Sequence, residues 1–119
     1  MNIKFSNGTT FEYRNAIETE EFFNGSSRRT LTFECAVGVI GVDKLNTLLS
    51  DETNVAHIEL SNGNTTNVHD GYVIKLKCGI ESKLVQAQTS ESPAVYEDRL
   101  IFKLGKRTYI EEQLRILGL

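Results

Sequence analysis

The chain has 119 residues, a formal net charge of −3, 24% charged residues and 39% hydrophobic residues. This length and composition are typical of one globular domain and exclude an intrinsically disordered chain. Proteins that bind the phosphate backbone of nucleic acids usually carry excess positive charge, so nucleic acid is not an expected partner. No apolar run is long enough to span a membrane and no signal peptide is visible, so we expect a cytoplasmic protein.

The N-terminal residues are predicted to form a β-hairpin. Ser6-Asn7-Gly8 has the composition of a tight turn, and apolar residues alternate with polar ones on both sides of it: Ile3, Phe5, Phe11 and Tyr13. Residues 17–23 are interpreted as a further strand, which leads to a loop at Asn24-Gly25-Ser26-Ser27. The clearest strand is predicted over residues 30–37, with one apolar face made by Leu31, Phe33, Cys35 and Val37.

A short helix is predicted over residues 43–49, because Leu45, Leu48 and Leu49 fall on one side of it. Residues 50–53 are expected to end this helix. A strand over residues 55–60 follows, and Ser61-Asn62-Gly63 repeats the turn chemistry of the first hairpin. The apolar face of this strand is expected to contain Ala56, Ile58 and Leu60.

Two long strands are predicted in the second half of the chain. The first has Tyr72, Ile74, Leu76 and Cys78 on one face, and residues 80–88 continue it or return beside it. A polar loop at residues 89–93 precedes the second strand, over residues 95–104. Its apolar face is expected to contain Tyr96, Leu100, Phe102 and Leu104. The tyrosines on these apolar faces argue against an exposed aromatic surface that binds single-stranded nucleic acid.

The C-terminus is predicted to form a short amphipathic helix. Thr108 and Glu111 have the spacing of a capping box, which satisfies free amides at the start of a helix. Ile110, Leu114 and Leu117 fall at i, i+4 and i+7 and form one apolar stripe. This stripe is expected to cover one side or end of the sheet; the alternative is that it docks on a neighbouring subunit.

These elements predict a single, strand-dominated α+β domain over residues 1–119. Connections between strands are too short for helical crossovers, so the strands should be mostly antiparallel. A rolled sheet, a β-sandwich or a small barrel would bury this many one-sided strands, together with one short internal helix and the C-terminal helix.

The residue types that usually carry chemistry form no recognisable site. His57 and His69 are expected at the surface without metal partners, and Cys35 and Cys78 are expected to be small buried hydrophobes. A disulfide between the cysteines would require their strands to be neighbours. No nucleophile elbow and no phosphate-binding loop is present, so we expect no catalysis, no metal and no cofactor.

Charged residues near the first Gly/Ser loop are the candidate interface. Arg28 and Arg29 are interpreted either as a solvated entrance to a strand or as a contact between their guanidinium groups and carboxylates of another subunit or of a ligand. Glu18, Glu20 and Glu21 form an acidic segment that we expect to face this basic pair in the next subunit. Residues 24–29 and the polar segment 86–93 are further candidate contacts.

Several segments together resemble small proteins encoded by prophages of Gram-positive bacteria, of the kind found in phage tails. The resemblance lies in Ile3-Lys4-Phe5-Ser6-Asn7-Gly8, the loop with Gly25 and Arg28-Arg29, Thr30-Leu31-Thr32-Phe33, and the segment 43–51 that leads to the strand around Ile58. It implies a β-sandwich or rolled sheet with a helix alongside, in a tail-tube, hub or baseplate protein. It also implies assembly into homo-oligomers or with other tail proteins, first in the bacterial cytoplasm and then in the virion.

The functional expectation is therefore a non-enzymatic assembly protein that acts through protein–protein contacts. The alternative is a small β-barrel that binds a peptide, a glycan or single-stranded nucleic acid.

Overall fold

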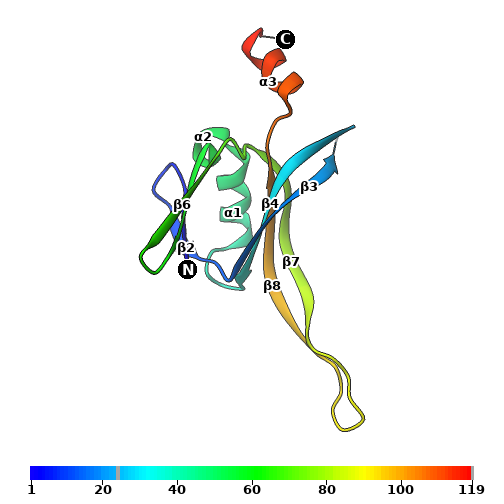
Figure 1. Ribbon diagram of the computed structural model, residues 1–119. Coiled ribbons are helices and arrows are strands. Elements are labelled where there is room, and N and C mark those ends of the chain that lie inside the picture. Colours follow the sequence, from blue (N-terminus) through cyan, green and yellow to red (C-terminus); the bar gives the residue numbers. More distant parts are fainter. Residues whose placement is uncertain (24, 119) are drawn as a thin grey trace.

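The computed structural model describes residues 1–23 and 25–118, and these residues form two four-stranded antiparallel sheets (Figure 1). Sheet A contains, in spatial order, β2 (Thr10–Glu12), β1 (Asn2–Lys4), β5 (His57–Asn62) and β6 (Thr65–Asp70). Sheet B contains β3 (Asn15–Phe23), β4 (Ser26–Ala36), β8 (Val95–Gly105) and β7 (Ile74–Gln86). The strand-dominated α+β class and the antiparallel pairing are confirmed, and the sheets do not close into a barrel.

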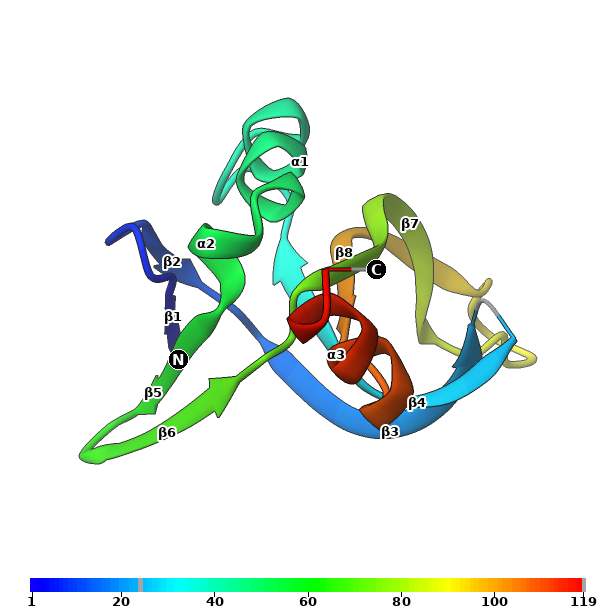
Figure 2. The ribbon, with the colours of Figure 1, turned by 90° about the horizontal axis from the view of Figure 1, so that it is seen from above.

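Three helices are found in the described part of the chain: α1 (Val42–Ser50), α2 (Glu52–Val55) and α3 (Tyr109–Ile116). The first two lie beside the sheets, whereas α3 projects beyond sheet B at the top of Figure 1 (see also Figure 2). None of these helices is long and apolar enough to cross a membrane, within the residues that the structure describes.

The two sheets and α1 share one hydrophobic core because each contributes an apolar face. At its centre Phe33 of β4 and Phe102 of β8 stack with ring centroids 4.6 Å apart. Phe11 of sheet A meets Phe102 edge-on at 6.1 Å, which joins the two sheets. Leu45, Leu48 and Leu49 cover the core from α1, as their helical spacing predicts. The alternation of polar and apolar residues therefore places the core correctly.

The hairpin of β7 and β8 extends well beyond the rest of sheet B. Strand β4 pairs with β8 only from Arg99 to Gly105, so residues 82–86 and 95–98 pair only with each other. We call residues 82–98 the arm; its tip, residues 87–94, contains the polar segment expected to make contacts. The arm points downward in Figure 1, away from α3, and the molecule is 61 Å long.

Several predicted boundaries are wrong, for local reasons. Residues 50–53 do not simply end the first helix: Asp51 caps a further helix turn, α2, which includes Val55. Strand β5 therefore begins at His57, and Ala56 is exposed instead of facing the core. Strand β4 ends at Ala36, which leaves the Val37 side chain half exposed. Asn24 lies outside the described residues, and Ser26 and Ser27 belong to β4 rather than to a loop.

The prediction that the Tyr72 side chain lies on a buried face is confirmed, since only 1% of Tyr72 is exposed. Tyr96 is 63% exposed on the arm, so its expected place on a buried face is wrong. The argument against an aromatic binding surface therefore holds at Tyr72 and fails at Tyr96. Apolar and polar residues alternate along β8 as far as residue 96, but β4 does not extend alongside the arm, so it does not cover Tyr96.

Both cysteines are free. Cys35 lies on β4 opposite Leu100, and Cys78 lies on β7 opposite Phe102, so β8 separates their strands. Cys35 is fully buried, as expected, and burial raises the pKa of its thiol to about 12.

Replacing Phe102 with alanine should lower the free energy of unfolding by roughly 3–5 kcal/mol, because it opens a cavity between the sheets. Tyr96→Ala on the same strand is the control, since an exposed side chain should cost no more than about 0.5 kcal/mol. Urea unfolding followed by circular dichroism measures both. Equal losses for the two variants would contradict the assignment of the core.

Candidate functional site

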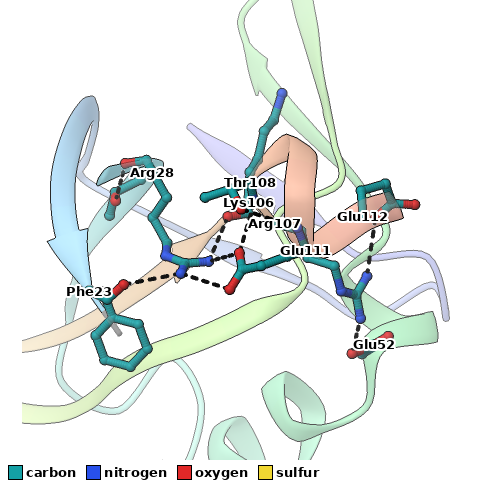
Figure 3. Close-up of polar contacts among 9 residues, drawn as sticks. Phe23, Arg28, Glu52, Lys106, Arg107, Thr108, Glu111 and Glu112 are labelled. Carbon is teal, nitrogen blue, oxygen red and sulfur yellow. Dashed lines mark hydrogen bonds and ion pairs between the residues drawn. The ribbon is translucent and has the colours of Figure 1, made fainter. Parts of the chain in front are cut away.

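The Arg28 side chain fixes the position of the C-terminal helix. Only 3% of Arg28 is exposed, although it carries a charge. Its guanidinium donates two hydrogen bonds to the Glu111 carboxylate, at 2.6 and 3.0 Å, as Figure 3 shows. It donates two more to the carbonyl oxygens of Phe23 and Lys106, both at 3.1 Å. Because bidentate pairs are directional, this arrangement sets both the place and the orientation of α3.

Glu111 has a second role at the start of the same helix. The Thr108 amide donates to the Glu111 carboxylate at 2.8 Å, and the Glu111 amide donates to the Thr108 hydroxyl at 3.3 Å. This is the capping box that the sequence predicts. The hydrogen bonds from Arg28 and Thr108 lower the pKa of Glu111 to about 2. One carboxylate therefore both starts α3 and attaches it to the body.

Gly105 provides the space that Arg28 needs. A Cβ atom at this position would lie 3.0 Å from Cδ of Arg28 and 3.1 Å from a methyl group of Leu76. Both distances are tighter than ordinary van der Waals contact. The absence of a side chain at the end of β8 thus lets the Arg28 stem cross the strand on its way to Glu111.

Further ion pairs connect the polar side of α3 to the body. Arg107, just before the helix, pairs with Glu52 of α2 and lies 3.9 Å from Glu112 (Figure 3). Arg115 pairs with Glu112 within α3. These charges line an open cleft of about 650 Å³ between α2 and α3. The acidic and basic side chains around the cleft therefore largely pair with one another.

The apolar side of α3 faces solvent. None of the helix's residues is buried. The predicted stripe is 69% exposed at Ile110, 42% at Leu114 and 69% at Leu117. Tyr109 and Ile116 are exposed as well, at 77% and 63%, but lie to one side of this stripe, and Tyr109 borders the cleft toward α2. The expectation that the stripe covers the sheet is wrong, because α3 is held by its polar side and presents its apolar side outward.

The structure brings the predicted interface residues together, but within one chain. Arg28 is buried against Glu111, so it is neither a solvated strand entrance nor available to another subunit. Arg29 pairs with Glu18 across the β3–β4 hairpin. Glu21 accepts a hydrogen bond from Lys103 at 2.8 Å, and Glu20 is exposed beside Arg29 in the register. The acidic segment therefore does not require a neighbour's arginines to balance its charge.

Both histidines have carboxylate partners that the sequence did not reveal. Asp70 lies 2.7 Å from His57 across the β5–β6 pair, and Glu59 lies 3.4 Å from it. These two carboxylates raise the pKa of His57. His69 lies 3.3 Å from Glu18. Within the described residues, no three or more such side chains are placed to hold a metal ion.

Comparisons with protein-family models, with curated proteins and with solved structures find no match to this chain.

The attachment of α3 should depend on pH through Glu111. Its pKa is lower in the folded protein than the ordinary value of 4.5. The attachment should thus be complete above pH 4.5 and weaken as the pH falls toward about 2. Heteronuclear NOE values of the α3 amides, measured by NMR along this titration, should fall while those of the core strands persist.

Glu111→Gln is the matching variant, since glutamine does not titrate. Its α3 should be more mobile than wild type at pH 7 and should lose the pH dependence. An equally rigid, equally pH-dependent helix in this variant would contradict the role assigned to the Arg28–Glu111 pair.

Proposed function

We propose that this chain is a non-enzymatic structural subunit that assembles with copies of itself through protein–protein contacts. The observation that supports this function is the orientation of α3. Surface helices normally bury their apolar side against their own domain. Here ion pairs bind the polar side, and a cluster of large apolar side chains remains exposed. Contiguous exposed apolar surface of this kind marks sites of protein–protein interaction.

The rigid attachment of the helix also supports an interaction role. A binding element that is already held in place loses little conformational entropy when its partner arrives. The four hydrogen bonds of Arg28 and the capping box supply that preorganisation. A frayed end of the domain would make few fixed contacts, whereas α3 is held by a buried arginine.

The arm is a second element suited to assembly. It extends away from the body and exposes apolar side chains on both strands, namely Leu84, Val85, Val95 and Tyr96. Its edges lack a flanking strand in sheet B, and unpaired edges readily accept another chain. A protein with contact elements at both ends is suited to repeated, end-to-end association.

The setting that we propose is a prophage virion, with this chain as a tail-associated component. This part of the proposal rests on the resemblance of the segments around Phe5, Arg28 and Ile58 to small tail proteins. Subunits of such structures act through their surfaces, and α3 and the arm are two places where this chain exposes several large apolar side chains.

Light scattering over a concentration series tests self-assembly. The mass of the wild-type protein should rise above the 13.4 kDa of one chain as concentration increases. The double substitution Ile110→Gln with Leu114→Lys should reduce this rise, because it removes two exposed apolar side chains without touching the core. Gln113→Lys is the control, since it changes net charge by the same amount at an exposed polar residue of the same helix. A wild-type chain that stays monomeric throughout would contradict the proposed function.

A further inference from the structure

An apolar groove opens on the body at a distance from α3. It lies between the loop of residues 37–41, the start of α1 and strand β7, and its volume is about 280 Å³. All of its lining residues are aliphatic or glycine: Val37, Gly38, Ile40, Gly41, Val42, Ile80 and Leu100. The groove therefore offers contact to hydrocarbon and no side-chain hydrogen bond.

The groove suits protein side chains better than a small molecule. Leu100 is fully buried, whereas Val37 and Ile80 are about half exposed, at 49% and 48%. Pockets that bind drug-sized ligands are usually about 300–1,000 Å³ and include a few polar groups that orient the ligand. This groove falls below that range and has no polar side chain in its lining. A few aliphatic side chains from another protein surface fit its chemistry.

The chain cannot fill this groove with its own α3. Leu100 lies five residues before Gly105 on β8, which is roughly 17 Å along an antiparallel strand. The α3 helix follows Gly105 and lies still farther from Leu100, and Arg28 holds Glu111 there. Figure 1 shows α3 at the top and the lower end of α1, where the groove lies, well below it. An α3 helix in this groove must therefore come from another copy of the chain.

We propose that α3 of one copy docks into this groove of the next copy. Ile110, Leu114 and Leu117 have the i, i+4, i+7 spacing with which helices insert into hydrophobic grooves. Among residues 1–23 and 25–118, nothing covers the exposed apolar helix or the open aliphatic groove, and each matches the chemistry of the other. This inference rests on the proposed function and identifies the partner as a second copy and the surfaces as α3 and the groove.

This docking joins unlike surfaces, so each copy contacts two others. Such head-to-tail contacts form closed rings or open filaments, according to the rotation between copies. A helix of two turns buries less than the roughly 1,200 Å² of a stable interface, so a single contact should be weak. Closure of a ring would strengthen it, because the last contact forms within one assembly.

A mixing experiment with two complementary variants tests the docking. The helix variant carries Ile110→Gln with Leu114→Lys and keeps its groove, and the groove variant carries Ile80→Lys and keeps its α3. Each should be monomeric alone, but an equal mixture, concentrated enough for a single weak contact, should form a dimer and nothing larger, because one intact helix meets one intact groove. Sedimentation velocity measures the masses, and circular dichroism checks that both variants are folded.

Val68→Lys is the matched control for the groove variant. Val68 is a β-branched residue on sheet A with the same 48% exposure as Ile80, and its variant should assemble like wild type. A mixture that stays monomeric, or an Ile80→Lys protein that assembles like wild type, would overturn the docking. If the wild type self-associates through α3, either result contradicts only the docking into the groove and leaves the proposed function unaffected. A monomeric wild type would instead contradict the proposed function itself.

Discussion

The position of one buried guanidinium determines what this protein shows to its surroundings. Removing the charge of Arg28 from water costs several kcal/mol unless a partner and further hydrogen bonds replace the lost hydration. Glu111 and two carbonyl oxygens supply that replacement at the two terminal nitrogens, whereas the buried Nε has no hydrogen-bond partner among the described residues. Since Glu111 lies on the polar side of α3, satisfying Arg28 brings this side toward the body. The apolar side then faces solvent as a direct consequence.

Most of the fold could be predicted because alternation with a period of two is a local property of the sequence. The face of β4 that contains Leu31, Phe33 and Cys35 is buried as its pattern requires. The orientation of α3 could not be predicted in the same way. Periodicity shows that a helix has an apolar side, but it does not show what that side packs against. Arg28, which determines the orientation of α3, lies 83 positions before Glu111 in the sequence.

The candidate interface illustrates the same limit. The sequence predicted the acidic segment of β3 and the arginine pair of β4 as partners, and of the two arginines only Arg29 contacts that segment, through Glu18. It placed the partners on different subunits, because the short loop between the two predicted strands does not fix the register that brings Glu18 to Arg29. In that hairpin Glu20 lies opposite Arg29, and Glu18 reaches the same arginine diagonally. The opposite charges attract as expected, and the tertiary fold makes the contact intramolecular.

A substitution at Gly105, inside sheet B, should change which side chains α3 exposes. Any side chain there meets the Arg28 stem inside the sheet, so its first effect is to shift the guanidinium away from Glu111. The effects of substitutions at positions 105 and 111 should then be non-additive, because both act on the same contact. If the chain assembles through α3 as proposed, a genetic screen for loss of assembly would identify Gly105 as an interface residue, although its own atoms lie in the protein interior.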